Sequence, residues 1–294
     1  MNDKSTSKNG FVVVDKSSGW TSHDVVAQAR KKLDTRKIGH SGTLDPSATG
    51  LLILGVGKAT RLLKFITDLP KSYRATMVLG AETNTLDADG EVTDVQDPVG
   101  IHLEDLQKAG YEYVGEILQI PPMVSAVKIN GKRLYEIARE GKEIERQPRP
   151  VHIFDLAIKS TKAKNVYQID VTCGSGTYIR SLVSDIARTA GTIAHVGTLR
   201  RSSLGSFNEA DADPIEDIKI IGMAEGLRDY SKIVVSDMDA SLIGVGKVFD
   251  EDHFELGDIS EPWVFLNNQG QLLAVYESHK GGTIKPDVVI PMDT

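Results

Sequence analysis

Asp45 stands in a run of small residues that would let a large substrate approach the backbone, Gly39-His40-Ser41-Gly42-Thr43-Leu44-Asp45-Pro46-Ser47-Ala48-Thr49-Gly50. Pro46 fixes its own φ and moves Asp45 out of the helical region. The apolar segment 51–56 follows and predicts a buried strand, which would hold a reacting carboxylate in place. A turn is the simpler interpretation of an isolated Asp-Pro pair. This run extends well beyond one turn, so we interpret it as a catalytic loop.

The elements that would position this loop mix strands and helices without a regular βαβ alternation. Apolar and alternating patterns predict strands over 11–14, 51–56, 71–80, 151–158 and 166–173. Helical spacing predicts helices over 22–33, 60–66 and 178–189. The segment 128–150 has the character of an excursion from the sheet. The sequence therefore predicts an α+β fold with a mixed, largely antiparallel central sheet.

The end of the chain differs in pattern from the rest. The acidic stretch 211–230 predicts a helix that closes the main domain, and short strands with turns follow from residue 235. The turn residues Asn268–Gly270 between two apolar runs predict a hairpin. We therefore expect a main domain over 1–234 and a small β-rich domain over 235–294.

Composition indicates an ordinary soluble protein, with 40% hydrophobic and 26% charged residues. Cys173 is the single cysteine, which excludes an internal disulfide and fits a reducing cytoplasm. The seven scattered histidines offer no zinc or haem spacing. The polar N-terminus has no signal-peptide pattern, and no apolar run is long enough to cross a membrane. These observations predict a cytoplasmic protein without a metal or a membrane partner.

The net charge of −7 is unevenly distributed. Residues 1–205 carry +5, residues 206–234 carry −4 and residues 235–294 carry −8. Basic residues gather over 128–149, where interleaved glutamates also fit a solvated helix with i,i+4 ion pairs. The asymmetry is compatible with nucleic acid at the main domain and unfavourable for it at the acidic end.

The Asp45 loop closely resembles the catalytic loop of the TruB-type tRNA pseudouridine synthases, GHxGTLDPxATGxL. Further segments resemble the family's motifs in the same order, over residues 15–22, 71–80, 119–135, 173–182 and 199–201. Ser17 and Val124 replace the usual proline and tyrosine. The resemblance covers about residues 11–205. It implies the pseudouridine synthase fold, with an RNA-gripping insertion at about 124–152 and a PUA-like C-terminal domain.

The same resemblance assigns the chemistry. Asp45 is implied to act covalently, and whether it attacks the ribose or the base stays open. Arg180 matches the arginine that pairs with this carboxylate, and a fixed cation would keep the carboxylate ionised. Tyr73 matches the tyrosine that stacks on a flipped base and transfers a proton. Without the flanking motifs, Arg180 would be a surface residue and Tyr73 a core residue.

Substrate contacts are implied in the same way. His40 matches the histidine that fills the place of the flipped base, and Tyr178 and Leu199 would line its pocket. Phosphate-contact candidates are Lys16, Arg61, Lys128, Lys132, Arg133, Arg200 and Arg201. The reaction needs no cofactor, and the glycine-rich segments 50–60 and 174–177 lack the residues of a phosphate loop or dinucleotide site.

The function implied is conversion of uridine 55 in the tRNA T-loop to pseudouridine, by base flipping and covalent catalysis through Asp45. A non-catalytic RNA-binding module on the same scaffold is the alternative from another class, which the presence of Asp45, Tyr73 and Arg180 disfavours. A sibling synthase acting in a protein complex would carry long basic extensions, which this chain lacks. We therefore expect a monomer that binds the T-arm stem-loop without an obligate protein partner.

Overall fold

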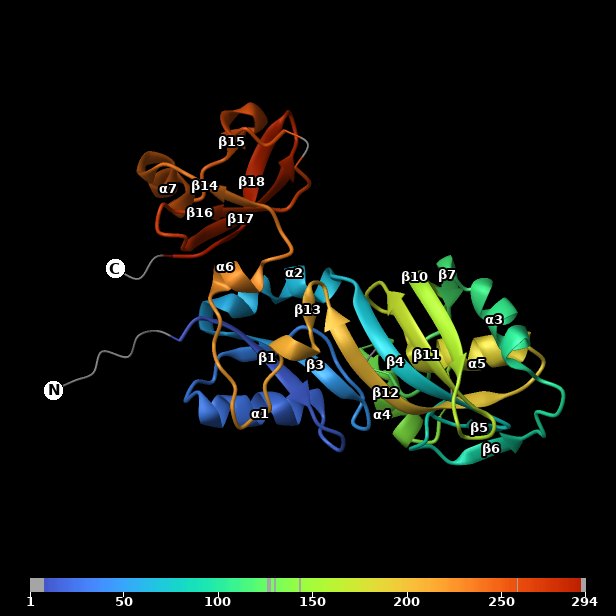
Figure 1. The fold of residues 1–294 in the computed structure, drawn as a ribbon. Coiled ribbons are helices and arrows are strands. Elements are labelled where there is room, and N and C mark those ends of the chain that lie inside the picture. The colour runs from blue at the N-terminus through green and yellow to red at the C-terminus, as the bar shows by residue number, and fades with distance from the viewer. Residues whose placement is uncertain (1–7, 126–127, 130, 143, 258, 292–294) are drawn as a thin grey trace.

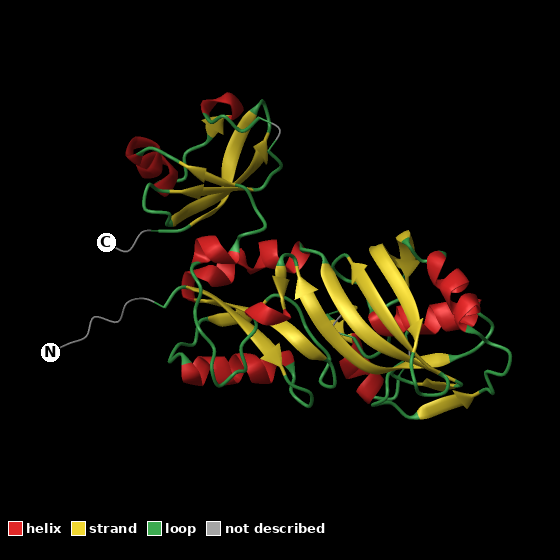
Figure 2. Ribbon diagram, viewed as in Figure 1, coloured by secondary structure: helices red, strands yellow, loops and turns green. Residues whose placement is uncertain are grey.

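The computed structural model describes residues 8–125, 128–129, 131–142, 144–257 and 259–291. Figures 1 and 2 show an elongated main domain built on one large sheet, with a smaller β-rich domain next to α2 and α6. Within the described part of the chain, every helix is too short or too polar to cross a lipid bilayer.

The large sheet has nine strands. Its main path runs β1 (Gly10–Lys16), β3 (Thr49–Val56), β12 (Ala194–Leu204), β4 (Lys71–Leu79), β11 (Val166–Cys173), β10 (Arg149–Ser160) and β7 (Gly115–Gln119). Two short strands extend it, β2 (Ile38–His40) on β3 and β13 (Phe207–Asn208) on β12. Every pairing is antiparallel except that of β12 with β3. The predicted mixed, largely antiparallel sheet is confirmed.

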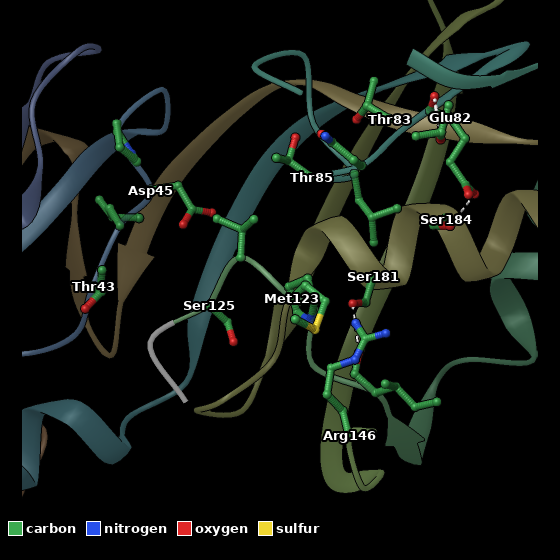
Figure 3. Close-up of a pocket in the computed structure, with 18 of the residues that line it drawn as sticks. Thr43, Asp45, Glu82, Thr83, Thr85, Met123, Ser125, Arg146, Ser181 and Ser184 are labelled. Atoms are coloured by element: carbon green, nitrogen blue, oxygen red, sulfur yellow. Dashed lines mark hydrogen bonds between the residues drawn. The ribbon is translucent and has the colours of Figure 1, made fainter. Parts of the chain in front are cut away.

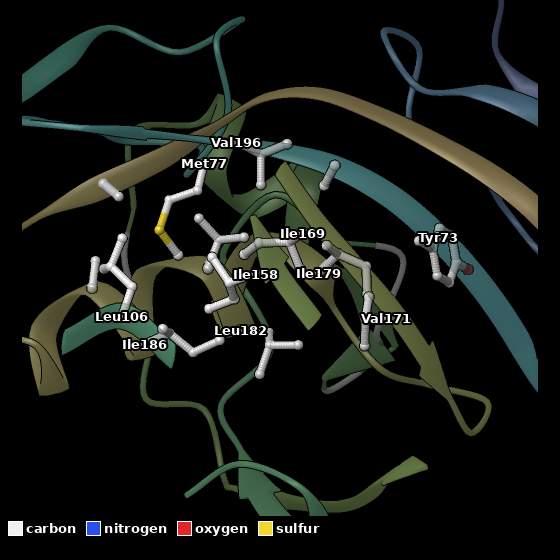
Figure 4. Close-up of a cluster of buried hydrophobic side chains, with 14 of the residues drawn as sticks. Tyr73, Met77, Leu106, Ile158, Ile169, Val171, Ile179, Leu182, Ile186 and Val196 are labelled. Carbon is white, nitrogen blue, oxygen red and sulfur yellow. The ribbon is translucent and has the colours of Figure 1, made fainter. Parts of the chain in front are cut away.

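Helices cover the sheet and complete its core. The helix α1 (Ser22–Lys32) begins with a capping box between Thr21 and Asp24, and its apolar positions Val25 and Val26 pack against β1 and β3. The helices α3 (Leu103–Tyr111) and α5 (Ile179–Thr189) pack on β4, β10, β11 and β12. Figure 4 shows this core, with Leu182 and Ile186 of α5 facing Met77 and Ile169, and Tyr73 at its margin.

The segment between β7 and β10, residues 120–148, overlaps the insertion expected at about 124–152. It contains the hairpin β8 (Lys128–Ile129) and β9 (Lys132–Arg133), followed by α4 (Leu134–Arg139). The hairpin forms its own two-stranded sheet, separate from the central sheet. A second two-stranded ribbon, β5 (Ala81–Thr83) with β6 (Val92–Val95), follows β4. The 3-10 helix η1 (Gly57–Leu62) and α2 (Leu63–Asp68) connect β3 to β4.

The predicted helix over 211–230 is wrong. The structure has only the 3-10 turn η2 (Glu209–Asp211) and the short helix α6 (Met223–Gly226) in this region. The chain between them runs along β1, where Asp213 N donates to Val13 O (3.1 Å) and Ile221 N donates to Phe11 O (2.8 Å). Pairing with the open edge of β1 satisfies these backbone groups in place of a helix.

The C-terminal sheet has the order β14 (Lys232–Val234), β16 (Trp263–Leu266), β17 (Leu272–His279), β18 (Thr283–Val289) and β15 (Phe249–Asp250). It therefore begins at Lys232, just before the expected boundary at 235. The helix α7 (Asp237–Gly244) and the 3-10 turn η3 (Glu251–His253) complete the domain. Val264 and Val288 of this domain belong to the same buried cluster as Phe11 and Leu51, so one apolar core joins the two domains.

Candidate active site

The Asp45 loop lies between β2 and β3 and is held by residues 16–22. The Ser22 hydroxyl accepts a hydrogen bond from Leu44 N (2.9 Å) at the start of α1. Gly19 N donates to Pro46 O (2.9 Å), and Ala48 N donates to Asp45 O (3.1 Å). These bonds fix the backbone on both sides of Asp45, so its carboxylate has a defined direction.

Lys16 lies beneath this loop, 1% exposed. Its Nζ donates to Trp20 O (2.6 Å), Ser17 O (3.1 Å) and Pro46 O (3.1 Å). Burial lowers the pKa of Lys16 to about 8, against the opposing effect of the Asp45 carboxylate. The structure therefore places this phosphate-contact candidate inside the protein, where it ties the loop to β1.

We expect Lys16→Met to lower the free energy of unfolding by about 1–3 kcal/mol, because it leaves three carbonyl groups without their donor. Thermal unfolding followed by circular dichroism measures the change, with the exposed Lys31→Met as control. Equal stability of the two variants would contradict a structural role for Lys16.

Arg180 pairs with Asp45 from the first turn of α5. Its Nε lies 3.0 Å from Asp45 Oδ2, and the arginine side chain is 3% exposed against 35% for the aspartate. Nη1 donates to Thr85 O and Nη2 to Val124 O, both at 2.8 Å. Because every nitrogen of the guanidinium is engaged, Arg180 is fixed in place and presents Nε to the carboxylate.

A second carboxylate, Asp87, shares this arginine. Its Oδ2 lies 3.5 Å from Arg180 Nη1, and its Oδ1 accepts hydrogen bonds from Thr85 Oγ1 (2.5 Å) and Asp89 N (3.1 Å). The sequence predicts only a turn over 87–90. Because aspartate is common in turns, the contact of Asp87 with Arg180 could not be recognised from this pattern. Burial raises the pKa of Asp45, Arg180 lowers it, and Asp87 adds to the increase.

Asp87→Asn is expected to lower the pKa of Asp45, because a neutral amide no longer opposes ionisation of the nearby carboxylate. The acid limb of the kcat/KM profile should move to lower pH. The amide oxygen can still accept from Thr85, so the local turn should persist. Turnover on a T-arm stem-loop between pH 5 and pH 8 measures the shift, and a shift to higher pH would contradict it.

Asp45 lies between two cavities. The larger has a volume of about 1040 Å³ and is bounded by the α1 start, segments 82–86 and 120–125, and α5. Figure 3 shows Asp45 and Thr43 on one side of this cavity, with Met123, Ser125 and Ser181 across from them. The smaller, of about 450 Å³, is lined by Ala48, Thr76, Arg180, Leu199 and Arg200. The smaller volume lies within the range of small-ligand sites, and the larger volume is at the upper end of that range.

The predicted aromatic residues lie on β4 and at the start of α5. Tyr73, on β4, is 9% exposed, and burial raises the pKa of its hydroxyl. Tyr178 precedes α5, and its backbone exchanges two hydrogen bonds with the Gln119 amide, at 2.7 and 3.0 Å. Burial also raises the pKa of Tyr178. The charge of Asp45 adds to the increase in pKa of both hydroxyls.

His40 ends β2 just before the catalytic loop. Its ring meets that of His23 edge-on, with centroids 5.3 Å apart, and its Nδ1 accepts from Gly42 N (3.3 Å). Burial lowers the pKa of His40, and His23 adds to the decrease. His23 lines the larger cavity, and His40 meets this wall only through the ring of His23.

The remaining basic candidates lie in different environments. Arg200 pairs with Asp15 through two bonds (2.9 and 3.0 Å) and with Glu209. Arg61 donates to Val289 O (2.7 Å) at the domain contact, so a phosphate would have to displace that bond.

Lys132 is 62% exposed and pairs with Glu140. For Lys128 and Arg133 the structure describes the hairpin backbone, and their side chains lie outside the described residues. Arg201 is buried.

Solved structures share this fold. The chain superposes on a Cbf5-Nop10-Gar1 complex with a TM-score of 0.71 at 23% identity, covering 97% of this chain and 86% of that one. It matches an H/ACA RNP bound to a substrate RNA containing 2′-deoxyuridine with a TM-score of 0.70 at 22% identity, covering 96% and 85%. The fold is the pseudouridine synthase fold predicted from the sequence.

Sequence relatives identify the family. Residues 30–179 match the N-terminal domain of the TruB family of pseudouridylate synthases, and residues 180–242 match the C-terminal domain of tRNA pseudouridylate synthase B. Proteins named tRNA pseudouridine synthase B are 40% identical in Shouchella clausii (95% of this chain, 97% of the relative) and 36% identical in Listeria innocua (97% and 99%). The chain belongs to the TruB family.

Proposed function

We propose that this protein converts uridine 55 in the T-loop of tRNA to pseudouridine, with Asp45 as the covalently acting group. The observation that carries the proposal is the contact between Asp45 and a buried, fully bonded Arg180 at the wall of two cavities. Family membership supports an isomerase acting on tRNA, since the relatives bear the name tRNA pseudouridine synthase B.

The reaction breaks the bond between N1 of uracil and C1′ of ribose, turns the base and joins C5 to C1′. Atoms and electrons balance within the nucleotide, so the protein has to supply only a nucleophile, a proton acceptor and a closed site. Arg180 stabilises the carboxylate form of the half-buried Asp45, where burial alone would favour the neutral acid. Attack by Asp45 on the ribose and attack on the base both remain consistent with this geometry.

A uridine within a folded stem-loop must leave its stack to reach Asp45. The proposal supposes such flipping, and the two cavities that Asp45 lines offer space for an extruded base. Leu199 lines the smaller cavity, and Tyr73 lies on the neighbouring strand. We expect Leu199 and Tyr73 to contact the flipped base, and His40 to act from behind His23, which lines the larger cavity.

Tritium release from a T-arm stem-loop labelled at uridine C5 tests this proposal, because C5 loses its hydrogen when it is joined to ribose. We expect release by the wild type, none by Asp45→Asn, and unchanged release by Asp97→Asn, which alters an exposed carboxylate. RNA binding by each variant is measured in parallel. Release by Asp45→Asn would remove Asp45 from the mechanism. Wild-type binding without release would favour a non-catalytic RNA-binding module.

We further propose that the insertion, and not the acidic C-terminal domain, supplies much of the affinity for tRNA. Lys142 lines the larger cavity and lies with Lys132 around Glu140. The C-terminal residues 235–294 carry a net charge of −8, which repels phosphate. The protein is expected to act as a cytoplasmic monomer.

The double variant Lys132→Glu with Lys142→Glu should weaken binding of the stem-loop by about tenfold and reduce the salt slope by about 1–2. Lys280→Glu, on the turn between β17 and β18, should change the dissociation constant by less than about twofold. Fluorescence anisotropy at several salt concentrations measures both. A larger loss from Lys280→Glu would show that the C-terminal domain holds the RNA.

A further inference from the structure

Arg201 and Tyr73 are direct neighbours across two strands. Arg201 of β12 stands opposite Tyr73 of β4 in the antiparallel register. Side chains of such a pair point to the same face of the sheet, with Cβ atoms about 4.5–5.5 Å apart. Arg201 is 1% exposed and Tyr73 is 9% exposed, so this pair lies in the interior.

Arg201 is an unusual buried cation. Its Nε donates to Leu51 O (2.6 Å), whereas its Nη2 has no hydrogen-bond partner among the described residues. Within the same part of the chain, no carboxylate forms an ion pair with it. A buried guanidinium without a paired anion is unfavourable for folding. An anion that forms next to it during turnover would recover part of that cost.

We propose that Arg201 is a positioning residue for Tyr73, which orients the tyrosine hydroxyl and stabilises the phenolate that accepts the C5 proton. The proposal rests on the proposed function. After C5 has joined C1′, the C5–H bond breaks and its proton moves to the phenolate oxygen. The electron pair forms the C5–C6 double bond, the C6–N1 double-bond pair moves to N1, and N1 takes up a proton. Charge and atoms balance without a further reagent.

The groups around Tyr73 act in opposite directions. Burial raises the pKa of Tyr73, Arg201 lowers it, and Cys173 and Asp45 raise it further. Arg201 comes from β12, Cys173 from β11 and Asp45 from the loop, and Arg201 is the cation among them. Without the charge of Arg201, the remaining effects all raise the pKa of Tyr73 and disfavour its phenolate form.

Lys71 offers a matched control. It lies two residues before Tyr73 on the same strand, is 6% exposed, and donates to Thr67 O and Leu69 O, both at 2.7 Å. Replacing Lys71 should destabilise the fold as the loss of any buried cation would, without acting on the Tyr73 hydroxyl. Arg201→Lys keeps the positive charge and loses the several N–H donors of the guanidinium group.

The test is the deuterium isotope effect on pseudouridine formation from a stem-loop carrying 5-deuterouridine, together with its pH profile. In Arg201→Gln the effect should rise at least twofold over wild type. Its rate should climb about tenfold per pH unit between pH 7 and pH 9, as expected when a phenolate fraction limits the rate. Arg201→Lys should bring the isotope effect and the pH profile part of the way back to those of the wild type. Lys71→Gln should lower only the melting temperature.

An isotope effect and pH profile in Arg201→Gln equal to those of Lys71→Gln would overturn the inference and leave the proposed function intact. If Arg201→Gln does not fold, the same comparison with Arg201→Lys decides. Absence of pseudouridine with the wild type would overturn the proposed function itself, and this inference with it.

Discussion

Arg180→Lys is expected to lower the rate of pseudouridine formation by about 100- to 1000-fold while RNA affinity changes little. The lysine keeps the positive charge, but one nitrogen cannot bond at once to Asp45, Thr85 O and Val124 O. The carboxylate would lose its fixed partner. Single-turnover kinetics on a T-arm stem-loop measures the rate, and filter binding measures the affinity.

Arg188→Lys is the matched control, since Arg188 lies further along α5 and pairs with Glu82, which lines the larger cavity with it. Its rate should fall less than threefold. Arg180→Gln adds a pH test: without the guanidinium, the pKa of Asp45 rises and the acid limb of kcat/KM moves to higher pH. This direction is opposite to that expected for Asp87→Asn. Shifts of the same sign in the two variants would contradict the shared-arginine arrangement.

Gly50→Ala is expected to lower the free energy of unfolding by more than about 3 kcal/mol. Gly50 has a φ of +100°, and a Cβ there would lie 2.2 Å from Arg201 O and 2.9 Å from Arg201 N. The parallel contact between β3 and β12 would have to open, and this contact places the Asp45 loop beside Arg201. Urea unfolding measures the loss.

Gly191→Ala is the control for the backbone conformation alone. Gly191 has a φ of +84°, and a Cβ there meets no atom within 4 Å. Its cost should be about 1 kcal/mol. If Gly50→Ala cost no more than Gly191→Ala, the close approach of the two strands would not be a determinant of stability.

Much of the site could be predicted from the sequence because its motifs are local. The loop around Asp45 and the helix start at Arg180 are each recognisable within a short segment, and the fold brings the two together. Asp87 could not be predicted in the same way. Its Asp-Ala-Asp-Gly segment has the composition of any turn, and only the tertiary contact with Arg180 distinguishes it.

The burial of two charged residues could not be predicted from the sequence. Lys16 and Arg201 are basic residues in RNA-associated motifs, which favours a surface position, yet both are 1% exposed. The acidic stretch 211–230 illustrates a second limit. Its composition fits a helix, but the open edge of β1 offers backbone partners that no local pattern reveals.

The apolar core that joins the two domains has a consequence for how RNA approaches. Since Val264 and Val288 share a core with Phe11 and Leu51, the C-terminal domain cannot swing away without exposing buried surface to water. Arg61 and Lys58 add bonds to Val289 O and Pro291 O across the same contact. The acidic domain therefore holds its negative charge in a fixed position. Its repulsion should keep a polyanion away from that side of the protein and direct it to the other side.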